Sequence, residues 1–387
     1  MLSQAISPRR ALDAATVAAL LLILFNPLGI DLYLSALPAI ERHFQANVSA
    51  SISVFVFSLG LGQLLFGPLA DRFGRRPVAL LGLVLYAASA GLASLTTHLS
   101  AFLLLRLAQG LGASASSVCA FAVIRDRFAG DAAARRYNLL NGALNIVPAL
   151  APVLGGWLSL QLGWQSCFWL LTVSALAAAG LLAWQMPETR IEQPGNRAPL
   201  PLIKVLAHPA MLRHGFCCCT SLGLIISYVT LAPTVLIARG GVGTTDFGLL
   251  FGGNALLIMA ASFVSLRTIG RFKLRHVLRT GLACMLLAGG VMLALSGQAG
   301  AWHYMLPVGI LGIGFACTLG PAGSLAMAPF GAMAGRAAAV LGCSQMLFAS
   351  ALSATLAALP LPPEWALGGA IILLVGTNLL LQATDHA

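Results

Sequence analysis

Long uninterrupted runs of apolar residues recur along the whole chain of 387 residues. A helix rises about 1.5 Å per residue, so about 20 apolar residues cross the roughly 30 Å hydrocarbon core of a bilayer. The runs do not alternate polar and apolar residues, as the strands of a membrane barrel would over about 10 residues. The pattern therefore predicts a polytopic α-helical membrane protein.

Twelve of these runs are long enough to be membrane-spanning helices. We expect them near 14–37, 51–70, 78–96, 102–124, 137–160, 165–186, 211–238, 246–269, 277–297, 303–328, 336–358 and 364–384. The longest polar connection follows the sixth run and separates an N-terminal half (1–186) from a C-terminal half (211–387), with a cytoplasmic linker at 187–210. The predicted fold class is an all-α integral membrane protein with twelve transmembrane helices in two six-helix halves around a central cavity.

Positive charge predicts the orientation of these helices. If the N-terminus is cytoplasmic, 19 of the 22 lysines and arginines lie on the cytoplasmic side, leaving Arg42 and Arg239 outside and Arg106 within a helix. Such a bias follows the positive-inside rule and predicts that both termini are cytoplasmic. The net charge of +11 then reflects topology, and we expect no nucleic-acid partner because no soluble basic surface remains.

The sequence shows no motif for metal binding, nucleotide binding or redox chemistry. The eight cysteines lie inside apolar segments without a C-x-x-C pair, which favours small buried hydrophobes over disulfide partners or metal ligands. The histidines show no metal-ligand spacing, and neither lysine belongs to a Walker loop. We expect no enzymatic activity, no metal and no cofactor, which leaves the proton gradient as the energy source.

The turn between the second and third expected helices is rich in charge, with the sequence GPLADRFGRRP. Its arginines alone would fit the positive-inside rule, but that rule does not account for an aspartate. The stretch resembles the loop signature of the major facilitator superfamily, with matches at Gly67, Leu69, Asp71, Arg72, Gly74, Arg75 and Arg76. The resemblance implies that Asp71 faces the start of the eleventh helix near Arg336. It also implies that Arg75 pairs with Asp126, and that both contacts latch an outward-facing state.

Two further stretches resemble motifs of the same superfamily. RLAQGLG resembles its fourth-helix motif, with matches at Arg106, Gln109, Gly110 and Gly112. VPALAPVLGGW resembles its fifth-helix antiporter motif, with matches at Pro152, Gly155 and Gly156, whereas Val147 and Ala151 depart from the pattern. The alternative for the second stretch is a Gly/Pro helix that only packs closely against a neighbour.

Residues 20–190 resemble one branch of the superfamily in particular. GIDLYLSALP, FAVIRD and WQSCFW are similar to the bicyclomycin/chloramphenicol-resistance branch of drug:proton antiporters, and within it to MdtL-type transporters. The resemblance is weak in the second half, where GRFKLRH lacks the aspartate of the first loop. It implies a monomer in the bacterial inner membrane, surrounded by lipids, that exports lipophilic compounds by alternating access in exchange for protons.

Two ionisable residues lie well inside the expected helices, and intramembrane charge is a functional hypothesis by default. Asp31 in the first helix and Arg106 in the fourth lie at similar depth because these helices run in opposite directions. We expect them to meet, directly or through water. Burial and a neighbouring cation act in opposite directions on the proton affinity of a carboxyl group, so Asp31 is the candidate proton carrier. The alternative is a permanent pair that only fixes packing.

Substrate specificity is less constrained by the sequence. Polar or aromatic residues on helices expected to line the cavity are Asn26, Tyr33, Asn145, Tyr228, Asn254 and Gln345, although each could serve only a helix–helix hydrogen bond. Some related exporters carry a second acid in the first helix, where this chain has Ile23 or Leu24. We therefore expect neutral or monovalent substrates, such as chloramphenicol- or bicyclomycin-like compounds. Alternatives are proton-coupled import or export of a small metabolite (a sugar or nucleoside), or a non-transporting membrane receptor.

Overall fold

The computed structural model describes residues 13–128, 130–189, 202–269, 271–298 and 300–383. Across these ranges twelve helical segments are long and apolar enough to cross a membrane. Their limits agree with the predicted runs to within a few residues, except that the first continues to Phe44. The expected all-α membrane fold is confirmed.

Six long helices form the first half of the chain: α1 (Ala14–Asp31), α3 (Ala50–Phe73), α4 (Arg75–Leu95), α5 (Leu99–Arg127), α6 (Gly130–Leu162) and α7 (Gln165–Gln185). Between α1 and α3 lie the 3₁₀ helix η1 (Leu34–Ala36) and the short α2 (Leu37–Phe44). The second half holds α9 (Pro209–Pro233), α10 (Thr244–Ile269), α11 (Leu274–Ala294), α12 (Trp302–Met327), α13 (Ala334–Ala358) and α14 (Pro363–Ala383). Short elements here are α8 (Leu202–Leu206), the π-helix η2 (Thr234–Arg239) and the 3₁₀ helix η3 (Ala328–Met333).

Local sequence explains where α1 begins and breaks. The Asp13 side chain accepts a hydrogen bond from the Thr16 backbone N–H at 2.8 Å, which satisfies one of the free donors at a helix start. Pro27 removes a backbone donor inside the helix, and the helix ends four residues later. Asp31 therefore lies at the break between α1 and η1.

The outer surface is apolar. Trp184, Leu373 and Leu104 are 83%, 69% and 68% exposed. Large contiguous apolar surface is rare on soluble monomers, whereas lipid tails solvate it without cost. The exposed side chains are thus consistent with twelve helices surrounded by a bilayer.

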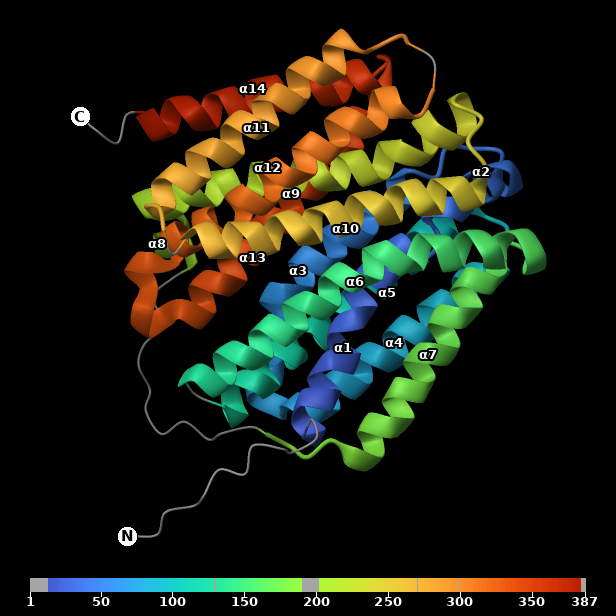
Figure 1. Ribbon diagram of the computed structural model, residues 1–387. Coiled ribbons are helices and arrows are strands. Elements are labelled where there is room, and N and C mark those ends of the chain that lie inside the picture. Colours follow the sequence, from blue (N-terminus) through green and yellow to red (C-terminus); the bar gives the residue numbers. More distant parts are fainter. Residues whose placement is uncertain (1–12, 129, 190–201, 270, 299, 384–387) are drawn as a thin grey trace.

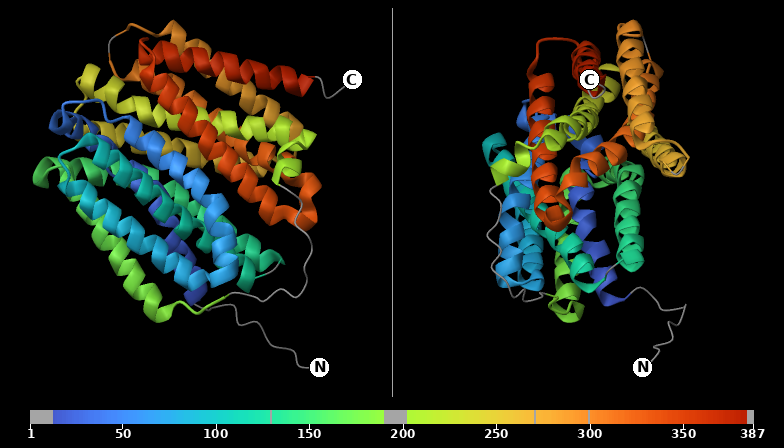
Figure 2. Two further views of the ribbon diagram at one scale, coloured as in Figure 1. Left: turned by 180° about the vertical axis from the view of Figure 1, so that it is seen from behind. Right: turned by 90° about the vertical axis from the view of Figure 1, so that its left-hand side faces the viewer.

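The two halves form separate helix bundles that meet along a central interface (Figure 1). The first bundle is blue to green and the second is yellow to red. Helix α3 packs against α13, and α6 packs against α10. The bundles converge at the end that carries α2 and diverge towards the end where α7 and α14 finish, as Figure 2 shows from two more sides.

Small residues hold the interface closed at the α2 end. The hydroxyls of Ser53 and Ser353 lie 2.9 Å apart, and Ser350 donates to the Ser53 carbonyl at 2.7 Å. On the other helix pair, a methyl group on Gly252 would come within 2.5 Å of the Ala149 carbonyl oxygen. Small and hydroxylated residues allow such close approach between helices in membranes.

Candidate functional site

The predicted charged turn lies between the end of α3 and the start of α4. Gly74 separates the two helices with φ of +102°, a conformation that residues with a side chain rarely adopt. The next residue, Arg75, is the first of α4. This glycine lets two spanning helices follow each other without a loop.

The guanidinium of Arg75 joins two carboxylates. It lies 2.7 Å from Asp126 at the end of α5 and 2.6 Å from Asp71 on α3. The side chains of Arg75 and Asp126 are only 6% and 7% exposed, whereas that of Asp71 is 65% exposed. Arg125 also approaches both acids, at 3.9 Å from Asp71 and 3.5 Å from Asp126. The expected Arg75–Asp126 pair is present.

The expected contact of Asp71 with the start of the eleventh spanning helix is not made in this structure. Among the described residues, its partners are Arg75 and Arg125, and its carboxylate is mostly exposed. The two bundles diverge at this end (Figure 1), and the aspartate is paired instead with α4 and α5 of its own half. The side chains of residues 331–335 lie outside the description.

The other residues of the turn motif have distinct environments. Arg72 is exposed, with its guanidinium 5.3 Å from the Phe73 ring. The Arg76 guanidinium donates to the Ala183 carbonyl near the end of α7. At Gly67, an added methyl group would meet no atom within 4 Å, so packing within the chain does not require this glycine.

One contact of the turn was missed by the sequence reasoning. The carboxylate of Glu188, just beyond α7, accepts the backbone N–H of Arg75 at 2.8 Å and of Arg76 at 3.1 Å. The acid follows the last turn of a hydrophobic helix and belongs to none of the motifs recognised in the sequence. Only the packing of α7 against α4 reveals this contact.

Arg106 makes no direct hydrogen bond or ion pair with Asp31 among the described residues, so the direct form of the expected contact is absent. Its side chain is fully buried inside the first bundle. It donates to Gln109 Oε1 at 2.5 Å and to the Gly29 carbonyl at 2.7 Å. The guanidinium also donates to the Tyr33 hydroxyl at 3.2 Å and lies 4.5 Å from the Tyr33 and Phe55 ring centroids.

The break in α1 explains this arrangement. Gly29 is among the last residues of α1, whose final carbonyls have no helical N–H partner. A cation is favourable at a helix C-terminus because it opposes the negative end of the macrodipole. Arg106 therefore caps α1 beside the rings of Tyr33 and Phe55. Its side chain turns into the first bundle and does not approach Asp31, although the two residues were expected at the same depth in the membrane.

Asp31 belongs instead to a polar group between the halves. It is 5% exposed, and no hydrogen bond or ion pair joins it to another described residue. Tyr228 in α9 lies near Asp31 and beside Asn254 in α10. The Tyr228 hydroxyl and the Asn254 amide oxygen are buried without a hydrogen-bond partner. Buried polar atoms are seldom left unpaired, so this group is equipped to hold a polar ligand or water.

The remaining expected cavity residues divide into two kinds. Tyr33 is fully buried in the first bundle and pairs with Ser51 at 2.9 Å, so its expected place in the cavity is wrong. Asn26, Asn145 and Gln345 are half-buried. The Asn145 amide donates to the Asn141 carbonyl one turn earlier, at 3.0 Å.

The glycines of the fourth-helix motif permit close packing. A methyl group on Gly110 would lie 2.5 Å from the Phe55 carbonyl oxygen of α3, and one on Gly112 would lie 2.6 Å from the Gly82 carbonyl oxygen of α4. Gln109 is fully buried as the partner of Arg106. This motif thus brings three helices of one bundle together.

The antiporter motif lies where α6 faces both α1 and the other half. The Pro152 carbonyl accepts the Ser35 hydroxyl at 2.7 Å. A methyl group on Gly155 would overlap the Leu32 carbonyl oxygen, and one on Gly156 would lie 3.0 Å from the Thr244 carbonyl oxygen. The motif therefore supports the break after Asp31 and the contact between halves.

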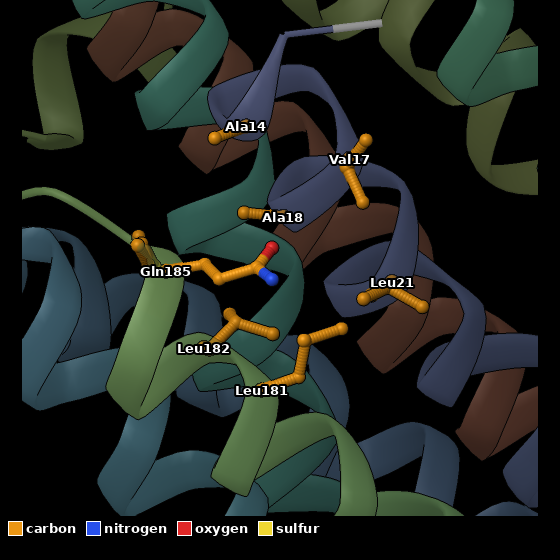
Figure 3. Close-up of a pocket in the computed structure, with 8 residues that line it drawn as sticks. Ala14, Val17, Ala18, Leu21, Leu181, Leu182 and Gln185 are labelled. Carbon is orange, nitrogen blue, oxygen red and sulfur yellow. The ribbon is translucent and has the colours of Figure 1, made fainter.

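A small cavity between α1 and α7 is separate from these groups. Ala14, Val17, Ala18, Leu21, Leu181 and Leu182 line it, and the Gln185 amide points towards it (Figure 3). Its volume of about 10 Å³ holds one water molecule at most. It therefore cannot take a drug-sized ligand.

Residues 19–377 match the family model described as Major Facilitator Superfamily. The chain belongs to the Major Facilitator Superfamily. It is 34% identical to a chloramphenicol resistance protein of Pseudomonas aeruginosa, over 83% of this chain and 78% of that protein. It is also 30% and 33% identical to multidrug resistance proteins MdtL of Vibrio parahaemolyticus and Escherichia coli. These two matches each cover 84% of this chain, and 84% and 83% of the respective relatives.

Solved structures of other superfamily members share the fold. A D-xylose-proton symporter superposes with a TM-score of 0.76 at 17% identity, covering 94% of this chain and 96% of the symporter. A bacterial homolog of the human lysosomal transporter Spinster, in an inward-facing and unoccupied conformation, gives 0.73 at 14% identity, with 95% coverage of both chains. At these identities the likeness concerns the fold alone. The family resemblance found in the sequence motifs is confirmed.

Proposed function

We propose that this superfamily member is a proton-coupled multidrug exporter of the bacterial inner membrane. It would act as a monomer with both termini cytoplasmic and exchange neutral or monovalent lipophilic compounds for protons. The observation that carries the proposal is the Asp31 carboxyl group, buried between the two halves without a bonded partner among the described residues. An ionisable residue inside the membrane costs free energy, so such residues are rare and mark substrate or proton pathways.

The proposed exchange uses both halves. Asp31 on α1 holds the proton, while the unpaired Tyr228 hydroxyl and Asn254 amide oxygen on the second half bind the polar part of the drug. Drug binding beside Asp31 displaces its proton, and reprotonation from the other side releases the drug. Because one carboxyl group carries one proton, export of a neutral drug would be electrogenic.

The names of the relatives support a drug as the substrate. The relatives at 30–34% identity are named for chloramphenicol resistance and multidrug resistance. The test is a drug-susceptibility panel in a pump-deficient host, with the wild type, Asp31→Asn and an empty vector. Expression should raise resistance to at least one lipophilic drug, and Asp31→Asn should abolish that gain.

The alternatives predict other results. A metabolite transporter would change uptake or export of a sugar or nucleoside without changing drug resistance. A receptor would bind drug in proteoliposomes without moving it. Reporter fusions test the orientation: one after Asn196 should be cytoplasmic, one after Gln298 periplasmic.

A further inference from the structure

Glu188 closes the start of α4 from the far side of the bundle. Its two carboxylate oxygens accept the N–H groups of Arg75 at 2.8 Å and Arg76 at 3.1 Å. These are the first two residues of α4, whose N–H groups have no helical partner. An anion at this point also opposes the positive end of the helix dipole. The geometry is that of a cap supplied from 112 residues away.

The turn before α4 is shaped to admit this carboxylate. A side chain at Gly74 would overlap the Glu188 carboxylate. The φ of +102° requires glycine at this position, and the carboxylate fills the space that the missing side chain leaves. The motif glycine and the acid fit each other.

The two helices cap each other. While Glu188 after α7 binds the start of α4, the guanidinium of Arg76 on α4 donates to the Ala183 carbonyl in the last turn of α7. A cation at a helix C-terminus and an anion at an N-terminus are both favourable. The pairing is thus reciprocal and fixes α4 and α7 relative to each other at this end.

We propose that Glu188 is a positioning residue of the transport cycle, tying the start of the linker between the halves to the charged turn. By holding the backbone of Arg75, Glu188 fixes the position from which the Arg75 guanidinium binds Asp71 and Asp126. Glu188 lies at the start of the expected 187–210 linker, directly after α7. The role in transport rests on the proposed function; the cap itself does not.

The test compares Glu188→Gln with Glu188→Asp. A glutamine amide keeps one acceptor oxygen but presents an NH₂ group to the second N–H and loses the charge. Aspartate keeps the charge and both oxygens on a shorter side chain. Glu364→Gln is the matched control, because Glu364 is another acid near the start of a spanning helix, in the first turn of α14, outside the charged turn.

Two readouts separate the cap from the transport role. Amide hydrogen exchange of Arg75 and Arg76 should accelerate about two- to fivefold in Glu188→Gln, the range expected for an anion at a helix N-terminus. Drug transport should show kcat lower by a similar factor with KM unchanged. Glu188→Asp should recover part of both, and Glu364→Gln should change neither.

Three outcomes would overturn the inference. Unchanged exchange at Arg75 and Arg76 would refute the cap. Faster exchange with unchanged kcat would make Glu188 merely structural, and an equal loss in Glu364→Gln would make the effect non-specific. A wild type that exports no drug contradicts the proposed function instead, and leaves the cap to be decided by the exchange readout.

Discussion

Asp126 and Asp71 both bind Arg75, but the structure predicts very different costs for losing them. Asp126 is 7% exposed and 2.7 Å from a guanidinium that is itself buried. Removing one partner of a buried pair costs about 3–5 kcal/mol. Because an asparagine keeps one acceptor oxygen, we expect Asp126→Asn to lose about 2–4 kcal/mol. Asp71 is 65% exposed, and exposed pairs contribute about 0–1 kcal/mol, so Asp71→Asn should barely change stability.

The assay is reversible unfolding of the purified protein in mixed micelles, with the free energy of unfolding compared between the two variants and the wild type. We expect the free energy of unfolding of Asp126→Asn to be well below that of Asp71→Asn. The value for Asp71→Asn should stay within about 1 kcal/mol of the wild type. Equal losses, or a larger loss for Asp71→Asn, would refute the assignment of Asp126 as the buried partner. Drug affinity should remain unchanged in both variants.

Three further predictions follow from the same contacts. Asp71→Asn should reduce drug turnover several-fold with intact binding, since the resemblance implies that Asp71 meets the start of the eleventh spanning helix in the outward-facing state, and losing a helix-end anion shifts a two-state equilibrium by about 0.3–1 kcal/mol; unchanged transport would contradict the latch. Arg106→Lys should cost about 1–3 kcal/mol in unfolding free energy, because an ammonium cannot hold Gln109 and the α1 carbonyl together; wild-type stability would argue against the cap. Gly110→Ala should destabilise by about 1–3 kcal/mol through overpacking, whereas Gly67→Ala should be neutral or slightly stabilising; equal thermal shifts would contradict the packing analysis.

The spans could be predicted from the sequence for a physical reason, whereas the Arg75–Asp126 pair was implied by the resemblance to the superfamily and agrees with the membrane geometry. Apolar length is set by the bilayer, and a charged turn between two consecutive helices can meet only the helix ends at the same membrane face. Both constraints are local or imposed by the membrane. They need no knowledge of side-chain direction.

Arg106 and Glu188 show what the sequence left open. Depth in the membrane placed Arg106 level with Asp31, but the face of a helix that a residue occupies depends on packing, and α5 turns Arg106 towards the Gly29 carbonyl. Glu188 meets α4 across 113 residues, and no periodic pattern encodes that approach. The orphaned hydroxyl of Tyr228 likewise becomes notable only once the opposite half is in place.

The central claim is that Asp31 carries the exchanged proton. Drug-induced proton release from purified protein in weakly buffered detergent measures it directly, wild type against Asp31→Asn. The wild type should release up to one proton per bound neutral drug, because a single carboxyl group is involved. Asp31→Asn should still bind the drug and release none, since an amide does not exchange a proton in this range. Equal release from both proteins would show that the proton is carried by another group.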